Sequence, residues 1–489
     1  MTTLPSPLPP YLVGVAQAPA ARYGATTAIA APELPGGVAA DVALVTLRAL
    51  LVDLGLDAAH AGTAQWNPLG AIVRRGARVV VKPNWVLHDN QGGYGLESLV
   101  THTSVLDAIL TYLHAAEPSS VICGDAPIQG CHFDVLRERM GIDAMVARHR
   151  AAGLPVEVRD FRRKVLLGRH GDPQVLTERR DAEYVLYDLG TESILEPITT
   201  REGEFRVTMY NPELLARTHA PGRHQFLVAR EVIDADVVIN VPKLKTHMKA
   251  GVTGALKNLV GINGLKDYLP HHRKGGSASG GDCYAGGSRL KATAEELLDV
   301  ANRTDSLGVR KALSVAARAC NFVDARLSGD RNLEGAWHGN DTVWRMCLDL
   351  QQLLRYGRGD GTIADVPQRL VVSLTDAIIA GDGVGPLANS PAPLGVLTLG
   401  TNPAAAEWVN TWLMGLDPER VPIVREAFGA LPRAVADCAP AAVRARLEGQ
   451  DVDPSSLVGR FGAPVRLPAG WAGHCEAALG PAARPDGDG

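Results

Sequence analysis

The sequence predicts an α/β fold: a mostly parallel, doubly wound sheet with an antiparallel excursion and a helical insertion. Short apolar, often β-branched runs are typical of buried strands, and stretches of roughly 10–15 residues with helical spacing lie between them. Such alternation requires right-handed crossovers and places helices on both faces of a parallel sheet. The expected strands include 12–16, 79–81, 121–123, 235–241, 370–374 and 396–399, and the expected helices include 39–54, 103–116, 132–152 and 403–414.

A chain of 489 residues is long enough for one large α/β unit with insertions. Short β-like pieces rich in Arg, Gly and Pro indicate the antiparallel excursion, and a run of glycines marks a flexible or substrate-covering loop. The expected organisation is an α/β core over 11–275 with the excursion at 155–230, a Gly-rich loop and helical insertion at 276–365, a continuation of the core at 366–468, and a flexible tail at 469–489.

The composition indicates a globular protein and argues against some classes of partner. The chain is 46% hydrophobic and 21% charged, as is normal for a globular protein, and its net charge of −4 argues against a general nucleic-acid or membrane-surface partner. We expect no membrane span and no secretory signal, hence a cytoplasmic location. The seven cysteines form no CxxC pair, which argues against a disulfide framework, a zinc ribbon and an iron–sulfur cluster.

Lysine is distributed unevenly. Of the 49 cationic residues 39 are Arg and 10 are Lys, and six of these lysines lie between residues 243 and 274, where a uniform distribution would place fewer than one. Lysine differs from arginine in being a compact charge whose pKa falls readily on burial. Ligands of open α/β sheets bind beyond the carboxyl ends of strands, and this cluster follows the strand 235–241. The pattern favours an anion-binding or catalytic site over a solvated basic face. A nucleic-acid patch is less favoured because Tyr268 is the window's only aromatic residue.

Other polar residues also follow expected strands. Lys82 and Asn84 flank Pro83 at the end of one strand, and Asp125 and Asp376 end two others. These residues either bind a ligand or have the ordinary roles of polar residues in turns and helix caps. His102 precedes the helix 103–116, which Thr103 or Ser104 could cap; it is either an acid/base group or an exposed residue at the start of the helix. The P-loop, GxGxxG, GxSxG and HExxH motifs are missing at the required positions.

Several motifs in sequence order resemble the domain-of-unknown-function family 362. They are Val80 to Asn84, Thr101-His102, Gly124 to Pro127, Asn240 to His247, Gly254 to Leu259, Asp376 to Ile379, Gly383 to Pro386 and Leu413 to Pro418. The resemblance implies an α/β fold. It also implies that some relatives carry a ferredoxin-like four-iron–four-sulfur module, for which this chain has no cysteine series.

The resulting hypothesis is an enzyme acting on a small anionic metabolite, a carboxylate or a phosphate, by acid–base or group-transfer chemistry. The expected catalytic residues are His247, His102 and Lys245. The expected substrate-binding residues are Lys82, Asn84, Lys243, Thr246, Lys257 and Asn258. Asp125 and Asp376 are candidate ligands of a divalent metal, the one cofactor that the sequence suggests. The alternatives are a non-catalytic anion- or cofactor-binding protein and a redox accessory protein without its own iron–sulfur cluster.

Overall fold

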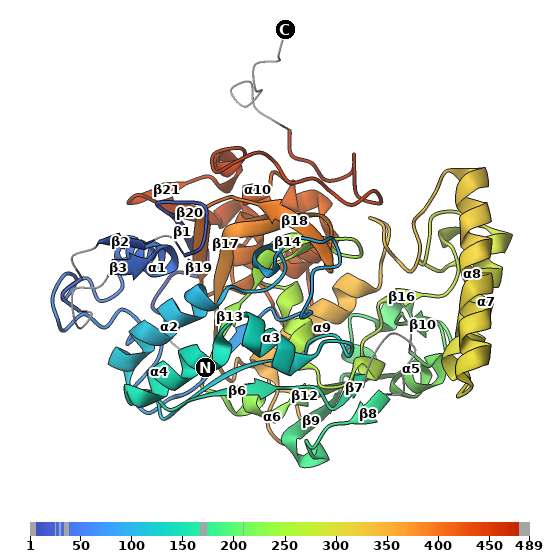
Figure 1. Cartoon of the computed structure of the whole chain (residues 1–489), viewed down its shortest axis with the longest axis horizontal. Helices are drawn as coiled ribbons and strands as arrows, with labels where there is room; N and C mark the ends of the chain where they lie inside the picture. The colour runs from blue at the N-terminus through green and yellow to red at the C-terminus, as the bar shows by residue number, and fades with distance from the viewer. Residues whose placement is uncertain are drawn as a thin grey trace, which may run out of the picture.

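The computed structural model describes residues 6–24, 26–28, 31–33, 39–166, 174–208 and 210–478, and it has the predicted α/β fold. A twelve-stranded mixed sheet runs through the molecule in the order β21-β20-β1-β19-β17-β13-β4-β5-β6 (Figure 1). Strands β14 (Lys243–His247) and β18 (Ala388–Ala392) pair with β17, and β15 (Gly251–Thr253) pairs with β14. The strands of this path are β21 (Gln450–Val452), β20 (Arg444–Leu447), β1 (Leu12–Gln17), β19 (Val396–Gly400), β17 (Leu370–Val384), β13 (Val237–Val241), β4 (Arg78–Pro83), β5 (Ser120–Asp125) and β6 (Val156–Asp160).

One half of the sheet is parallel. The strands β17, β13, β4, β5 and β6 are parallel neighbours, so their carboxyl ends meet at one edge. Asn240 of β13 lies opposite Lys82 on one side and Ser373 on the other. The other half is antiparallel at β19, which lies between β17 and β1.

Helices cover both faces, as a doubly wound sheet requires. Val79 and Val81 of β4 pack into one hydrophobic cluster, whereas Val80 packs into the other. This alternation follows the two-residue period of a strand. The first cluster contains α1 (Val42–Asp53), α2 (Thr103–Ala116), α3 (Phe133–Arg139) and α4 (Ile142–Ala151), and the second contains α9 (Val343–Tyr356) and α10 (Pro403–Leu413). The single helix expected over 132–152 is in fact two, divided at Gly141, whose φ of 63° favours glycine.

The antiparallel excursion is present. It holds one hairpin and a three-stranded sheet in the order β11-β12-β9. These strands are β7 (Lys164–Leu166), β8 (Gln174–Leu176), β9 (Tyr184–Asp188), β11 (His219–Ala220) and β12 (Arg223–Ala229). The expected boundary at 155 differs from the structure, because β6 pairs with β5 in the main sheet. This region also contains α5 (Pro212–Thr218), α6 (Arg230–Asp234) and β10 (Phe205–Arg206), which pairs with β16 (His272–Arg273) further along the chain.

The helical insertion is a hairpin of α7 (Arg289–Arg303) and α8 (Leu307–Ser328), set apart from the sheet at one side of the molecule (Figure 1). The insertion does not extend to residue 365 as expected, because α9 is buried along its length in the core. The glycine-rich segment before α7 is folded back on itself by hydrogen bonds such as Cys283 N–H to Gly275 O at 3.0 Å. Within the described residues, no helix combines the length and the apolar character needed to cross a bilayer.

The segment expected to be a flexible tail from residue 469 is packed as far as it is described. Trp471 is 1% exposed, and its indole N–H donates to Met248 O at 2.8 Å. Its ring lies against Gly251, where a Cβ would come within 2.9 Å of the ring. Cys475 is also buried, and Leu416 forms a bridge to Glu476. This packing fixes the turn that follows β14 (Lys243–His247) and precedes β15 (Gly251–Thr253). Residues 479–489 lie outside the described part.

We expect Trp471→Ala to lower the free energy of unfolding by about 3–5 kcal/mol, because it leaves a cavity and an unpaired carbonyl beside β15. Chemical denaturation followed by fluorescence of the remaining tryptophans and by circular dichroism measures the change. The matched control is Leu327→Ala on α8, whose side chain is 79% exposed and should change stability by no more than about 0.5 kcal/mol. A Trp471→Ala variant as stable as this control would contradict the packing role.

Candidate functional site

The candidate site lies at the carboxyl edge of the parallel strands. Lys82 is the penultimate residue of β4, and Asp125 is the last residue of β5. After Pro242 the chain leaves β13 and forms β14, which pairs with the long strand β17. Lys243 then lies opposite Asp376, and Lys245 lies opposite Gly381. Strand pairing therefore brings the polar residues of four sequence segments to one edge, as predicted.

A first buried ion pair joins Lys82 and Asp125. Their Nζ and Oδ1 atoms are 2.7 Å apart, and both side chains are almost fully buried. The Lys82 ammonium also donates to Asn258 Oδ1 at 3.1 Å, and Asn84 Nδ2 donates to the same oxygen at 3.0 Å. Any Cβ at Gly261 would come within 1.8 Å of Asp125 Oδ1, so only glycine fits beside this pair.

A second buried ion pair joins Lys243 and Asp376 at 2.7 Å, with both side chains fully buried. Tyr23 completes it: the Lys243 ammonium donates to its hydroxyl at 2.7 Å, and the hydroxyl donates to Asp376 Oδ1. The backbone N–H of His102 donates to Asp376 Oδ2 at 2.9 Å. Tyr23 was not predicted, because it lies in a loop without a recognisable motif.

His102 has a structural role in this arrangement. Its ring stacks on Tyr23 with centroids 3.8 Å apart, and its Nδ1 accepts the Ser104 N–H at 3.2 Å, so His102 itself caps α2 in place of the expected Thr103 or Ser104. Burial, opposed in part by Asp376, lowers its pKa to about 4. The imidazole is therefore neutral at neutral pH.

The two aspartates expected as metal ligands lie in two separate ion pairs. Asp125 and Asp376 each bind a different lysine ammonium, and their remaining oxygens accept backbone or hydroxyl donors. A metal ion would have to displace an ammonium from either carboxylate. Thr246 is also separate from the lysines, because its hydroxyl donates to Gly383 O at 2.9 Å and accepts from Asn389 Nδ2 at 3.1 Å.

Four further lysines form no ion pair with any described carboxylate. We call Lys245, Lys249, Lys257 and Lys266 the unpaired lysine group. Lys245 donates to Leu99 O at 2.5 Å and to Pro386 O at 3.4 Å, Lys266 donates to Ala126 O at 3.0 Å, and Lys249 donates to Thr208 Oγ1 at 3.1 Å. Lys257 is 7% exposed, yet within the described ranges its ammonium has neither a hydrogen-bond nor an ion-pair partner.

Lys257 is the electrostatic centre of this group. Burial lowers the pKa of Lys245, Lys249 and Lys266, and the charge of Lys257 lowers each of them further. For Lys266 the pKa falls to about 7. Burying an unpaired ammonium costs several kcal/mol, and either deprotonation or a bound anion removes that cost.

His247 borders the unpaired lysine group, and one of its ring nitrogens already accepts hydrogen bonds. Its Nδ1 accepts the backbone N–H groups of Lys249 at 3.0 Å and Ala250 at 3.3 Å. Burial and the charge of Lys257 hold its pKa well below the usual range, so the ring is neutral. These contacts assign the single ring proton to Nε2. His247 is thus a hydrogen-bond donor from Nε2, and its expected role as a general acid/base stays a prediction.

A comparison with protein-family models gave a match. Residues 177–411 match the model of the family described as Domain of unknown function (DUF362), which agrees with the resemblance seen in the sequence motifs. This stretch contains β14, β17 and the whole unpaired lysine group. A comparison with curated proteins gave no match.

Among solved structures, the chain is similar to a crystal structure of a Thermotoga maritima protein from a structural genomics consortium. The two share 12% identity at a TM-score of 0.28, over 67% of this chain and 51% of that one. The chain thus matches about half the length of that protein.

We expect Lys82→Met to lower the free energy of unfolding by about 3–5 kcal/mol, because it leaves the Asp125 carboxylate buried without its counter-charge. The matched control is Arg75→Met. Arg75 pairs with Glu117 at the same N···O distance of 2.7 Å, but its side chain is 83% exposed, so the control should lose under about 1 kcal/mol. Urea titrations of the two variants measure the difference, and equal losses would contradict the burial argument.

Proposed function

We propose that the protein is an enzyme that binds a small anionic metabolite, a carboxylate or a phosphate, at the unpaired lysine group. The observation that carries the proposal is the Lys257 ammonium, which is buried without a partner in the described part of the chain. An anion between Lys257 and its neighbours would supply the missing counter-charge.

The two ion pairs and the unpaired group take different roles in this proposal. Lys82 and Lys243 are already neutralised by Asp125 and Asp376, so they hold the strand ends in position. Lys257 and Lys245 would hold the anion, and the Nε2–H of His247 would donate to it. These fixed donors would also stabilise negative charge that develops during a reaction.

Lys266 is the residue best suited to proton transfer. A pKa of about 7 lets the amine exist in both protonation states near neutral pH, which is the requirement for general acid–base catalysis. This assigns to Lys266 the role that the sequence suggested for His247. We also propose a reducing, cytoplasmic location, because all seven cysteines are free thiols.

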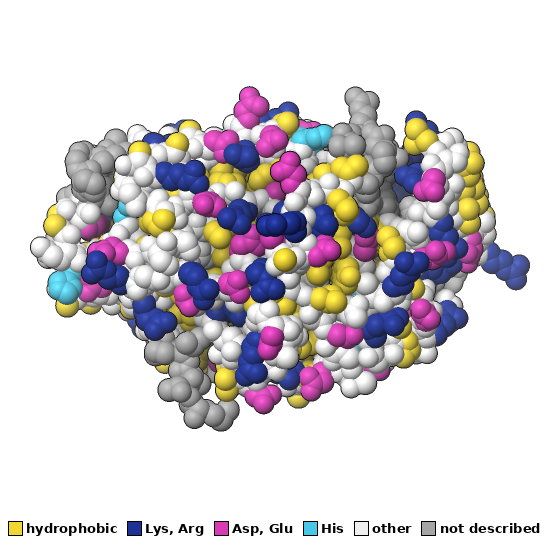
Figure 2. Space-filling model, turned by 90° about the horizontal axis from the view of Figure 1, so that it is seen from below, with side chains coloured by type: hydrophobic (Ala, Val, Ile, Leu, Met, Phe, Trp, Pro, Cys, Tyr) yellow, Lys and Arg dark blue, Asp and Glu magenta, His cyan; other side chains and the backbone are white. Residues whose placement is uncertain are grey.

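The distribution of charge on the protein surface favours a small ligand over a polyanion. Figure 2 shows lysine and arginine side chains interspersed with aspartate and glutamate over the face in view. Lys245, Lys257 and Lys266 are buried in the interior, which suits a small anion better than a polyanion such as nucleic acid.

We expect sulfate and succinate to bind the wild-type protein and Lys257→Met to weaken both by at least about tenfold, the effect of losing one charged hydrogen bond. Isothermal titration calorimetry measures the dissociation constants. The matched control is Lys311→Met on α8, an exposed lysine, which should bind as the wild type does. Equal binding by Lys257→Met and Lys311→Met would contradict the proposal.

Binding of sulfate at pH 8 should also take up protons. Free Lys266 is mostly neutral at pH 8, and a bound anion stabilises its ammonium form, so its pKa rises and up to about one proton enters. At pH 6 the Lys266 amine is already protonated, so fewer protons should be taken up when sulfate binds. Titrations in two buffers of different ionisation enthalpy measure the uptake, and Lys266→Met should reduce it. Sulfate does not titrate in this range, so equal enthalpies in both buffers at pH 8 would refute the role of Lys266.

A further inference from the structure

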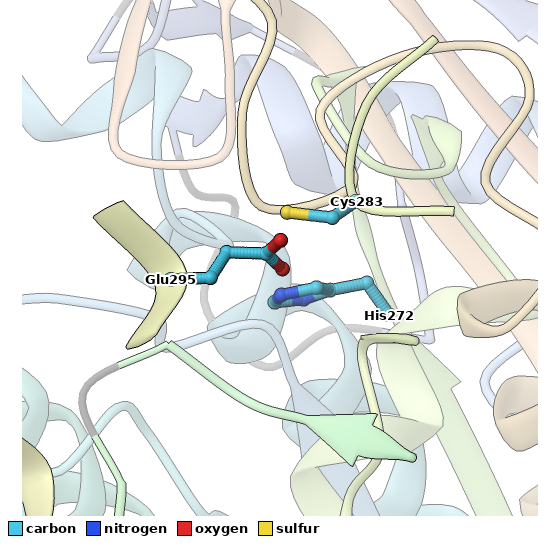
Figure 3. A group of neighbouring side chains, drawn as sticks. All are labelled: His272, Cys283 and Glu295. Carbon is cyan, nitrogen blue, oxygen red and sulfur yellow. The ribbon is translucent and has the colours of Figure 1, made fainter. Parts of the chain in front are cut away.

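A second cluster of chemically active side chains lies outside the lysine site. His272, Cys283 and Glu295 point toward one another (Figure 3), and one potential ligand atom from each lies within 4.8 Å of the other two. His272 and Cys283 are buried at 4% and 2% exposure, and Glu295 is half-buried. None of the three belongs to the site described above.

Local structure brings these residues together. His272 belongs to β16, which pairs with β10, and Glu295 lies on α7. Between them the glycine-rich segment folds tightly: a Cβ at Gly281 would come within 2.1 Å of Gly275 O, so the backbone approaches itself more closely than other residues allow. The Gly275 N–H donates to both Glu295 oxygens at 3.1 and 3.2 Å, which orients this carboxylate.

The imidazole of His272 is unsatisfied. Its Nδ1 is buried without a hydrogen-bond partner, and neither ring nitrogen has a partner among the described residues. A buried polar atom of this kind costs about 1–3 kcal/mol unless a ligand satisfies it.

Neighbouring charges leave the cluster open to a cation. Lys274 is the lysine nearest to the cluster in sequence. Its ammonium pairs with Asp299 at 2.8 Å and with Glu296 at 2.7 Å, and it forms no ion pair with Glu295. The Lys249 ammonium donates to Thr208 Oγ1 at 3.1 Å and forms no ion pair with Glu295. A thiolate and a carboxylate together balance a divalent ion.

We propose that His272, Cys283 and Glu295 form a binding site for a divalent, zinc-type cation. One imidazole, one thiolate and one carboxylate form a donor set that Zn²⁺ prefers, and three protein ligands leave a fourth position for water or substrate. On binding, the Cys283 thiol releases its proton to solvent as the metal–sulfur bond forms. The inference is independent of the proposed anion site.

Cobalt(II) substitution tests the site. Metal-free protein, prepared by dialysis against a chelator, is titrated with Co²⁺ and followed by its absorption spectrum. We expect one Co²⁺ per chain with a thiolate-to-cobalt charge-transfer band, and competition by Zn²⁺. Cys283→Ser should abolish the band, whereas Cys320→Ser, which removes a partly exposed cysteine on α8, should retain it.

Glu295→Gln provides a second variant. It keeps an oxygen that can accept the Gly275 N–H, and we expect it to weaken Co²⁺ binding by at least about tenfold while leaving the fold intact by circular dichroism. A wild-type protein without the charge-transfer band would overturn the proposal, and so would a band that survives Cys283→Ser. Unchanged affinity in Glu295→Gln would remove the carboxylate from the site and refute the three-ligand centre.

Discussion

Several lysine ammonium groups are buried inside this protein, and each of them must be stabilised there. Water stabilises a charged lysine strongly, so each buried lysine needs a carboxylate, a set of carbonyls, deprotonation or a ligand. Lys82 and Lys243 form ion pairs with carboxylates, and the Lys245 ammonium donates hydrogen bonds to backbone carbonyls. Lys257 has no partner in the described part of the chain, and this difference separates the groups that hold the fold from the groups available for chemistry.

The sheet makes this placement possible. Parallel strands end at one edge, and β14 extends that edge beyond β13 by pairing with the exceptionally long β17. Within β14, Lys243 lies opposite Asp376 and its ammonium donates to the Tyr23 hydroxyl. After a shift in register, Lys245 lies opposite Gly381 and its ammonium donates to Leu99 O in the segment between β4 and α2. Residues far apart in sequence thus become neighbours through strand register alone, and a change of one residue in that register would separate them.

The sequence was most informative where local patterns decide the outcome. Alternating strands and helices predicted the fold, and the excess of lysine between 243 and 274 located the cation-rich edge. The partners of those lysines were not predictable, because Asp125 and Asp376 reach them only through long-range register. The sequence places His102 at the start of a helix, but its capping of α2 is not predictable because capping by histidine has no distinctive pattern. The packing of the segment at Trp471 is not predictable either, because a single large aromatic residue gives no periodic signal. Lys266 lies within the lysine window, but its lowered pKa depends on its three-dimensional surroundings, which no local pattern predicts.

The two proposed sites bear on each other through charge. Lys249 belongs to the unpaired lysine group, and it also lowers the pKa of His272 in the second cluster. A divalent cation at His272 would raise the cost of keeping Lys249 charged, whereas an anion near Lys249 would offset both positive charges. Cation and anion would therefore favour each other's binding, and by thermodynamic linkage the effect is the same in both directions.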